Sequence, residues 1–448
     1  MNRTSPPAPF WLFTSAILLL AAGRSSALCA DDAPTDEQLL TLTQRATFRY
    51  FWDGAEPVSG LSRERIHLDD PTYDQDVVTS GGTGFGLMAI LVGIERNFVI
   101  RPDAVTRLES MLTALEKADR FHGAWPHWLY GPTGKVKPFS PKDDGGDLVE
   151  TSYLAAGLLC VRQYFRDGSE REQRLAAVAD RLWREIEWDW YRGPDRENVL
   201  FWHWSPKHAW EMNFRIRGYN ECLITYVLAG ASPTHGIPPE VYHEGWAENG
   251  AIRQTSAAFG IELKLRHQGV QKYCGPLFWA HYSYLGLDPR ELRDRYADYW
   301  EQNRNHVAMC KAYCVENPGH HDGYSSKCWG LTSSYSLEGY AGHSPEHDEG
   351  TIAPTAALSS FPCDPDSCMA ALRYFHDELG DRLLGTYGFY DAFNQDKDWF
   401  PRQYLAIDQG PEIIMIENYR SGLIWKLFMS APEVQHGLTR LGFEVNGR

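Results

Sequence analysis

The chain has 448 residues, a formal net charge of −16, 13% aromatic residues and nine cysteines. An acidic chain is a poor partner for nucleic acid or an anionic membrane surface, because both are negatively charged, and it would also repel a polyuronate. Neutral polymers are not repelled, so the composition favours a neutral partner.

The first 30 residues are typical of a secretory signal peptide. An early arginine precedes an apolar stretch, residues 10–22, that is short for a membrane span. Small residues follow, and we expect cleavage between Ala27 and Asp31. A lipid anchor would need Cys29, but Leu28 before it fits a lipobox poorly. The sequence therefore predicts an exported protein, periplasmic or secreted, without an anchor.

The remaining residues, 31–448, are expected to form a single domain with a net charge of −18, because the first 30 residues hold two arginines and no acid. No Ser/Gly-rich or Pro-rich linker divides them. Some helical patterns are apolar on nearly all faces, whereas others, such as 169–187, are charged on one face. Inner and outer helices in one chain predict an all-α fold, the (α/α)6 toroid, with aromatic-rich loops at one end.

Helical periodicity recurs along the whole length of this domain. We expect helices at 35–53, 82–97, 103–119, 145–167, 169–187, 209–229, 254–266, 289–316, 351–360, 365–380 and 410–430. Strand signals are sparse and predict short hairpins at loops, for instance around 199–204.

The stretch "SGGTGFGLMAI", residues 80–90, resembles a phosphate-binding loop only superficially. It lacks a preceding parallel-strand pattern and a following Lys-Ser/Thr, so neither the dinucleotide nor the P-loop motif is present. We expect its glycines to let the start of a helix approach its neighbours closely.

Four carboxylates crowd into "KDDGGDLVETSYLAAGLL", residues 142–159. Asp143 and Asp144 stand where a helix would start, where carboxylates cap free N–H groups and suit the helix dipole. Asp147 and Glu150 instead share a helical stripe with Leu154. Carboxylates on the inward stripe of a buried helix are costly unless they are paired or used. A buried ion pair is one explanation, and an acidic catalytic cleft is the one we favour.

Two further acids stand beside apolar helices. Glu221 lies in "FRIRGYNECLITYVLAG" and Asp408 in "YLAIDQGPEIIMIENYRSGLIW". Glycoside hydrolysis needs one protonated acid and one ionised carboxylate on either side of the scissile bond, and burial can raise the pKa of one of them. Tryptophans are frequent in the loops, where indole faces either stack on sugar rings or close gaps. For the whole set we favour a carbohydrate groove.

The eight cysteines after the signal segment favour some disulfides in an exported protein, with a small Cys363–Cys368 loop as one option. Zinc is the alternative for Cys310, Cys314 and Cys328, with His320 and His321 nearby in sequence. That spacing matches no standard finger. We therefore expect no metal and no cofactor.

Seven long motifs together resemble the bacterial glycoamylase-like proteins of glycoside hydrolase family 144. They are "TSGGTGFGLMAILVGIER", "ADRFHGAWPHWLYGPTGK", "KDDGGDLVETSYL", "RGYNE", "WGLT", "GTIAPTAALSSFP" and "AIDQGPEIIMIENYRSGLIW". The resemblance runs from about Leu40 to Phe443. It implies an (α/α)6 barrel, an inverting mechanism and cleavage of β-1,2-glucan to short sophoro-oligosaccharides.

The resemblance also implies roles for individual residues. Glu221 becomes the candidate general acid and Asp408 the base side, with Asp147 and Glu150 as further catalytic acids. Asp143, Asp147 and Glu150 remain alternatives for the base. The implied substrate-binding residues are Asp143, Trp125, His127, Asn220, Trp329 and Arg420. The chain departs from the expected pattern at Cys363 and Cys368 and at Glu412, whose charge lies close to the proposed base.

Four other functions remain open. A β-1,2-glucan transglycosylase, or an exo-acting hydrolase that releases sophorose, would keep the same acids. A polysaccharide lyase would need a Tyr or His base and cationic groups for a uronate, which the charge of −18 disfavours. An exported glycan-binding protein would need the aromatic residues but not the buried acids. The expected partner is β-1,2-glucan or its oligosaccharides, and we expect a monomer.

Overall fold

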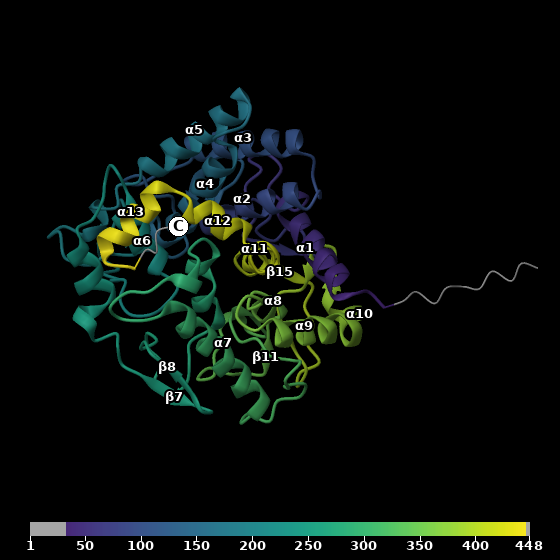
Figure 1. Ribbon diagram of the computed structural model, residues 1–448. Helices are drawn as coiled ribbons and strands as arrows, with labels where there is room; N and C mark the ends of the chain where they lie inside the picture. Colours follow the sequence, from purple (N-terminus) through teal and green to yellow (C-terminus); the bar gives the residue numbers. More distant parts are fainter. Residues whose placement is uncertain (1–32, 445–448) are drawn as a thin grey trace, which may run out of the picture. The chain divides into compact units, whose positions relative to one another are not determined.

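The computed structural model describes residues 33–444, and the predicted signal peptide lies outside this range. Residues from Asp36 onward form one unit that contains a continuous hydrophobic core. Helices dominate it, as Figure 1 shows, and the strands are only two to four residues long. No helix in the described part of the chain is long and apolar enough to cross a membrane.

The helices follow one another in chain order. They are α1 (Asp36–Trp52), α2 (Ser80–Glu95), α3 (Arg101–Lys117), α4 (Leu148–Phe165), α5 (Glu170–Arg184), α6 (Leu223–Ala231), α7 (Tyr299–Glu316), α8 (Pro354–Leu358), α9 (Pro365–Arg373), α10 (Gly380–Leu383), α11 (Ala406–Arg420), α12 (Leu423–Met429) and α13 (Pro432–Leu441). Short 3-10 and π turns lie between them, among them η5 (Tyr282–Leu285).

The helices divide into buried and amphipathic ones. Helices α2, α4, α6 and α11 are buried along most of their length, whereas α3, α5 and α13 bury one face only. Helix α2 packs against both α4 and α11, α5 covers α4, and α13 covers α6. An inner set covered by an outer set agrees with the helix pattern that the sequence predicts.

Glycines allow the closest of these contacts. A Cβ added at Gly84 of α2 would lie 2.3 Å from the carbonyl oxygen of Tyr153, and one at Gly157 of α4 would lie 2.4 Å from that of Gly84. Neither position can carry a side chain without moving a backbone. This confirms the expectation that the glycines near residue 84 serve close packing.

The short strands of residues 33–444 pair into small antiparallel sheets. The pairs are β1 (Arg65–His67) with β15 (Gln403–Leu405), β2 (Val77–Thr79) with β3 (Trp128–Tyr130), β3 with β4 (Lys135–Lys137), β5 (Gly146–Asp147) with β6 (His203–Trp204), β7 (Ser256–Ala258) with β8 (Ile261–Leu263), β9 (Ser333–Ser336) with β10 (Gly339–Gly342), β11 (Thr351–Ile352) with β14 (Phe393–Asn394), and β12 (Leu384–Gly385) with β13 (Gly388–Phe389).

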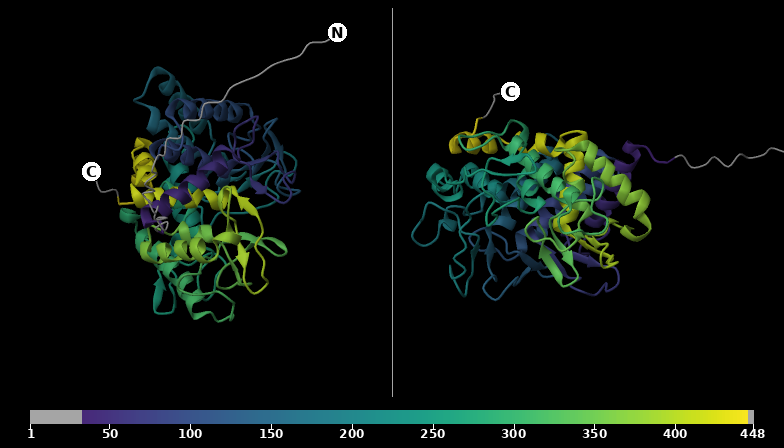
Figure 2. Two further views of the ribbon diagram at one scale, coloured as in Figure 1. Left: turned by 90° about the vertical axis from the view of Figure 1, so that its right-hand side faces the viewer. Right: turned by 90° about the horizontal axis from the view of Figure 1, so that it is seen from below.

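The strands lie at the beginnings of the buried helices. Strands β2, β5 and β15 lead directly into α2, α4 and α11, and β11 precedes α8 by one residue. Figure 2 shows the strands and long loops gathered on one side of this unit, with α12 and α13, drawn in yellow, on the opposite side. Residues at the starts of the buried helices are therefore brought to the loop-rich side.

Several predicted helices are wrong in extent or type. The expected helix 254–266 is the β7–β8 hairpin, because Phe259 and Gly260 both adopt positive φ and form a tight turn. The expected helix 209–229 is mostly loop, with Gly218 at φ +75°, and α6 begins only at Leu223. The strand expected around 199–204 exists at β6 but pairs with β5 instead of closing a local hairpin.

Other predicted helices have different boundaries. The expected helix 289–316 begins at Tyr299, where Asp298 caps the backbone N–H groups. The expected helix 410–430 is divided into α11 and α12 by Gly422, which has φ +70°. Within 365–380, regular α-helix ends at Arg373 and a π turn follows. Helix α13 was not predicted.

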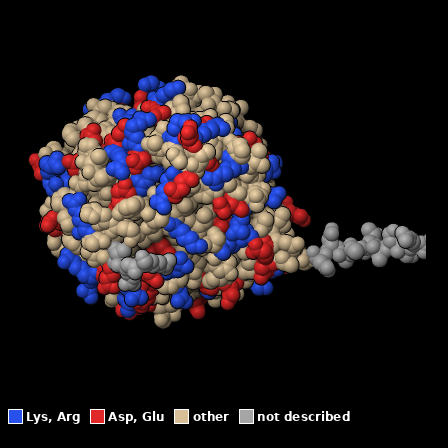
Figure 3. All heavy atoms as spheres, turned by 45° about the horizontal axis from the view of Figure 1, so that its top comes forward, with Lys and Arg blue, Asp and Glu red and all other residues tan. Residues whose placement is uncertain are grey.

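All eight cysteines of the described residues are buried and unpaired, contrary to the expected disulfides. Their thiols pack in the hydrophobic core, where a free cysteine behaves as a small apolar side chain. Among the described residues, the one group of potential metal ligands does not include Cys310, Cys314 or Cys328. On the surface, acidic and basic side chains alternate across the face drawn in Figure 3.

Candidate active site

The candidate catalytic acids lie at the starts of three buried helices. Asp147 directly precedes α4 and Glu150 lies in its first turn, while Glu221 stands two residues before α6 and Asp408 lies in the first turn of α11. Helix starts offer free N–H groups and the positive end of the dipole, which stabilise carboxylates. The fold thus places each acid where part of its charge is compensated.

Asp147 is a fully satisfied buried carboxylate. One oxygen accepts hydrogen bonds from the backbone N–H groups of Val149 and Glu150, at 3.0 and 2.9 Å. The other accepts from His127 Nδ1 at 2.9 Å and from Trp202 Nε1 at 3.2 Å. Although burial opposes the charge, the hydrogen bond and positive charge of His127, together with the N–H of Glu150, lower the pKa of Asp147. With its acceptor sites occupied, Asp147 is better suited to hold its neighbours than to take up a proton.

The cap of α4 corrects one prediction. Asp147, not Asp143 or Asp144, is the N-cap residue. Asp144 instead accepts hydrogen bonds from Ser205 Oγ and pairs with Lys207 at 2.8 Å.

His127 supplies positive charge to this group of acids. Burial opposes its protonation, but Glu150, Asp147 and Asp143 outweigh that effect and raise the pKa of His127 to about 9. The ring is therefore an imidazolium at neutral pH, and it stacks on Phe139 with ring centroids 4.3 Å apart. One cation is thus shared by several acids, which explains part of the crowding in the sequence.

Glu150 combines a fixed oxygen with a raised pKa. Its Oε2 accepts from the backbone N–H of Gly81 at 2.9 Å and from Thr79 Oγ1 at 3.1 Å. Gly81 has no room for a side chain, because an added Cβ would lie 2.4 Å from that oxygen. Burial raises the pKa of Glu150, with Asp147 adding to the effect and His127 opposing it. The start of α2 therefore fixes an acid that belongs to α4.

Asp143 is buried beside the same group. Its Oδ2 lies 3.5 Å from Nε2 of His203. Burial and the charge of Asp147 raise the pKa of Asp143 to about 7. Burial lowers the pKa of His203 to about 4, so this imidazole is neutral at neutral pH. We call Asp143, Asp147, Glu150 and His127 the α4 acid cluster.

Glu221 has the properties that a general acid needs. Burial raises its pKa to about 7, and Glu150 and Asp147 add to the effect. Its backbone carbonyl accepts hydrogen bonds from Ser283 Oγ and, at 3.4 Å, from the hydroxyl of Tyr153, so the chain is held in place. Near neutral pH its carboxyl is poised between the protonated and the ionised state.

Asp408 is paired with a residue that the sequence analysis missed. Burial, together with the charge of Asp391 and a hydrogen bond between the two carboxyls, raises the pKa of Asp408 well above its usual value. Burial also raises the pKa of Asp391 to about 6, while the backbone N–H of Tyr335 donates to it at 2.7 Å. Glu64, which pairs with Arg65, adds negative charge nearby.

Asp391 Oδ1 and Asp408 Oδ2 are buried and receive no hydrogen bond from an N–H or hydroxyl donor among the described residues. A hydrogen bond between two carboxyls requires a proton on one of them. We call these two residues the carboxyl pair. Asp391 stands in "GFYDAFN", and a lone acid between aromatic residues was the only signal for it in the sequence.

Three residues of the α4 acid cluster place potential metal ligands close together. One ligand atom from each of His127, Asp143 and Asp147 lies within 4.8 Å of the others. His127 already donates its Nδ1 proton to Asp147 and is held protonated by the acids. A metal ion would have to displace that proton, so the donor set fits an internal ion pair better than a metal site.

The structure buries the two tryptophans that were predicted to stack on sugar rings, so this prediction is wrong. Trp125 and Trp329 are both 0% exposed, so neither ring face is free to stack on a sugar. Trp125 Nε1 donates to the carbonyl of Leu115 at 3.2 Å, and Arg120 lies over the ring at 4.2 Å from its centroid. Both tryptophans close the core, the alternative that the sequence analysis left open for any single Trp.

Arg420 lies away from the acids. It stands at the end of α11, twelve residues after Asp408, which corresponds to about 18 Å along the helix. Its guanidinium bonds Glu37, Gln44 and Thr41 of α1. Its expected contact with substrate is therefore wrong.

Asn220 lies beside Glu221 but is only 2% exposed. Its Oδ1 accepts from the backbone N–H of Cys222 at 2.9 Å, and its Nδ2 donates to Gln268 at 2.7 Å. These bonds fix the turn into α6 and so position Glu221.

Two cavities of about 470 and 640 Å³ lie apart from the acids. The first is lined mainly by α3, residues 58–61 and the turn 131–134. The second lies where α1, α9 and the end of α11 meet, and Arg420 lines it. Neither includes a member of the α4 acid cluster or of the carboxyl pair.

Fold and site together define a helical protein with several buried carboxyls of perturbed pKa, the arrangement that acid–base catalysis requires. Residues 213–432 match the model of the Glycoamylase family. An endo-β-1,2-glucanase from Chitinophaga pinensis, in complex with sophorotriose and glucose, is 58% identical, with a TM-score of 0.91 over 92% of this chain and 99% of that one. The chain belongs to this family of glycoamylase-like proteins.

Two further relatives extend the comparison. The exo β-1,2-glucooligosaccharide sophorohydrolase of Parabacteroides distasonis is 45% identical over 427 residues, and the match covers 91% of this chain but only 58% of that protein. An endo-β-1,2-glucanase from Talaromyces funiculosus, in complex with sophorose, is 13% identical with a TM-score of 0.66, over 91% of this chain and 88% of that one. The second likeness concerns the fold alone.

Proposed function

We propose that the protein is a glycoside hydrolase of family 144, with an (α/α)6 barrel, that cleaves β-1,2-glucan to sophoro-oligosaccharides by inversion. The observation that carries the proposal is the partly buried carboxyl of Glu221, whose pKa of about 7 suits a general acid. The names of the similar bacterial proteins support the choice of substrate.

The mechanism assigns each acid a separate task. Glu221 protonates the leaving glycosidic oxygen, and Asp408 accepts the proton of the attacking water once its shared proton lies on Asp391. Asp147 stays ionised and holds His127, whose positive charge offsets Asp143 and Glu150. The α4 acid cluster thereby keeps Glu221 in a negative field, which favours its protonated form.

The buried tryptophans leave other aromatic rings to contact sugars. Phe139 is 48% exposed, stacks on His127 and lies 4.8 Å from the ring centroid of Trp128. Sugar rings present apolar C–H faces, so we place a stacking position at Phe139 and Trp128.

Incubation with linear β-1,2-glucan, followed by product sizing, tests the activity. Sophoro-oligosaccharides are expected, and their size distribution distinguishes endo from exo action. Equal activity on β-1,3- or β-1,4-glucan would contradict the proposed substrate. Products that are longer than the glucan supplied would indicate a transglycosylase. NMR of fresh product tests the stereochemistry, because an initial β-anomer would contradict inversion.

We also propose that the protein is exported after cleavage of residues 1–30 and acts as a monomer. The apolar stretch 10–22 and the small residues before Asp31 support export. N-terminal sequencing of protein from the periplasm or medium, with light scattering of the purified protein, tests both statements. A retained N-terminus or a stable dimer would contradict them.

A further inference from the structure

The hydroxyl of Tyr282 is a buried polar group without a partner. Tyr282 begins η5 and is 6% exposed, and its hydroxyl oxygen has no hydrogen-bond partner among the described residues. Buried polar groups are normally paired, so an exception points to a missing partner. Here the missing partner is a ligand or a water molecule.

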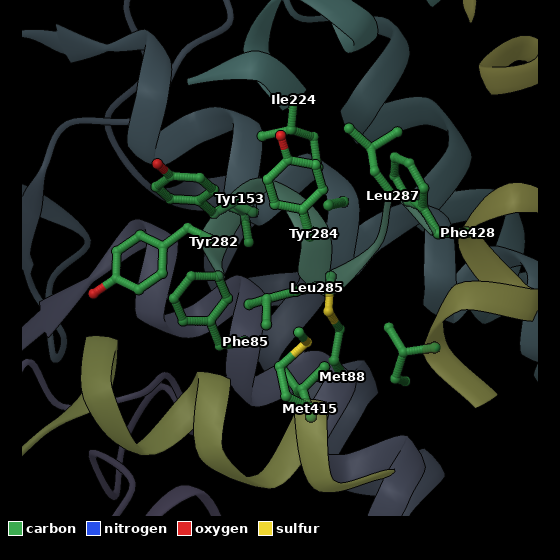
Figure 4. Packing of buried hydrophobic residues seen from close by; sticks show 14 of the residues in the cluster. Phe85, Met88, Tyr153, Ile224, Tyr282, Tyr284, Leu285, Leu287, Met415 and Phe428 are labelled. Carbon is green, nitrogen blue, oxygen red and sulfur yellow. The ribbon is translucent and has the colours of Figure 1, made fainter. Parts of the chain in front are cut away.

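The ring is held firmly in one orientation. Its centroid lies 4.9 Å from that of Phe278 and 5.5 Å from those of Phe85 and Tyr153. Figure 4 shows the hydroxyls of Tyr282 and Tyr153 on the same side, away from Leu287 and Phe428. The hydroxyl of Tyr282 therefore has a fixed position outside the apolar core.

The negative charges of candidate catalytic acids from several elements act on this hydroxyl. The groups that act on the Tyr282 hydroxyl are Asp408 of α11, Tyr340 of β10, Glu150 of α4 and Glu221 before α6. Burial and these charges keep the phenol protonated, so it acts as a hydrogen-bond donor. An ionised carboxylate can only accept a hydrogen bond, which makes a donor valuable here.

We propose that the Tyr282 hydroxyl donates a hydrogen bond to a neutral oxygen bound between Glu221 and Asp408, either the attacking water or a sugar hydroxyl. This inference rests on the proposed function. A water that gives its proton to Asp408 still has lone pairs that need a donor, and a sugar hydroxyl has the same need. Tyr282 meets that need without adding negative charge, and its packed ring fixes the direction of the bond.

The chain provides a matched control two residues further on. Tyr284 lies in the same short helix, and its buried hydroxyl forms a side-chain hydrogen bond with Tyr219. Its hydroxyl points toward Ile224 in Figure 4, and the charges that act on it come from Tyr219, Tyr299 and Asp294, none of which is a candidate catalytic residue. Each change to Phe removes one oxygen atom and keeps the ring, but only the hydroxyl of Tyr282 is acted on by the candidate catalytic acids.

The experiment compares Tyr282→Phe with Tyr284→Phe in the full-length mature protein. With β-1,2-glucan as substrate, Tyr282→Phe should lower kcat by about 10- to 100-fold, somewhat less than the loss of an oxyanion-hole donor. Tyr284→Phe should stay within about twofold of the wild type. Tyr282→Phe should not lower Tm, because it loses an unpaired buried hydroxyl, whereas Tyr284→Phe loses a hydrogen bond with Tyr219 and should lower Tm slightly.

Calorimetry with sophorotriose, on Glu221→Gln with and without Tyr282→Phe, identifies the bound oxygen. Weaker binding indicates a sugar hydroxyl, whereas unchanged binding with a lower kcat indicates the water. Equal kcat values for the two tyrosine variants, with unchanged sophorotriose binding, overturn the inference. If the wild type does not cleave β-1,2-glucan, the proposed function fails, and the binding measurement alone then decides the role of Tyr282.

Discussion

Asp391 and Asp408 meet carboxyl to carboxyl beside the start of α11, and one proton must lie between them. The N–H of Tyr335 and the charge of Arg65 favour the ionised form of Asp391, so the proton stays on Asp408 in the free protein. Asp408 can serve as a base only after that proton has moved. Asp391 thus controls when Asp408 is ready to react.

Replacing Asp391 with Asn tests this control. The amide removes the negative charge that raises the pKa of Asp408 and can donate a hydrogen bond to its carboxylate. The pKa of Asp408 should therefore fall, and the acidic limb of the pH profile of kcat/KM should move to lower pH. An acidic limb at the same pH as in the wild type would show that Asp391 does not govern Asp408.

The alkaline limb of the pH profile of kcat/KM should reflect the ionisation of Glu221. Because its pKa is about 7, the fraction of protonated Glu221 falls as the pH rises through 7, and kcat/KM should fall with it. Glu221→Gln should lower kcat by about 10²–10⁴-fold while sophorotriose still binds. The exposed Glu211, changed to Gln, is the matched control. Near-normal activity in Glu221→Gln would remove this residue from the chemistry.

The sequence was most informative where local rules act. The apolar helices α2 and α4, the close contact at Gly84 and the presence of acids at helix starts follow from periodicity and composition. The resemblance added which acids to consider. The alternation of inner and outer helices likewise came from hydrophobic patterning alone.

The errors arise where backbone conformation or tertiary packing decides. A positive φ at Phe259 and Gly260 turned an expected helix into a hairpin. The burial of Trp329 cannot be deduced from the sequence, because an aromatic-rich loop can either stack on sugars or pack into the core. Asp391 becomes important only because the fold brings it to Asp408, seventeen positions later in the chain.

The burial of Trp329 gives a prediction about stability. Its side chain is 0% exposed, and its Nε1 has no hydrogen-bond partner among the described residues. Trp329→Ala should therefore lower the free energy of unfolding by about 3–5 kcal/mol, whereas Trp329→Phe should cost less because it leaves a smaller cavity. Urea denaturation measures both. An unchanged stability in Trp329→Ala, with weaker glucan binding, would restore the platform interpretation.

Glu412 should make stability depend on pH. It is 0% exposed, its only hydrogen bond among the described residues comes from Thr47 Oγ1 at 2.6 Å, and burial raises its pKa to about 8. An acid whose pKa is higher in the folded state stabilises the fold at low pH. That contribution falls by about 1.4 kcal/mol per pH unit between its unfolded pKa and about 8.

Glu412→Gln removes this titration. The variant should gain stability relative to the wild type as the pH rises from 5 to 8, measured by urea denaturation at each pH. The exposed Glu316, changed to Gln, is the matched control. A constant difference for Glu412→Gln would mean that the carboxyl ionises inside the fold without cost.

Activity should survive removal of divalent metal ions. His127, Asp143 and Asp147 have the residue types of a metal site, but the Nδ1 proton of His127 already fills the position that a cation would take. With a pKa of about 9, His127 gives up that proton only at alkaline pH, and Asp147 has both oxygens engaged by N–H donors. Dialysis against EDTA should therefore leave kcat on β-1,2-glucan within about twofold of its starting value, since no step of the proposed mechanism uses a metal ion. Loss of activity in EDTA that a divalent ion restores would show that a metal replaces the imidazolium proton.

The charge of His127 can be tested separately. His127→Gln, which keeps a hydrogen-bond donor but loses the positive charge, should lower activity by raising the pKa values of Asp143 and Glu150 further.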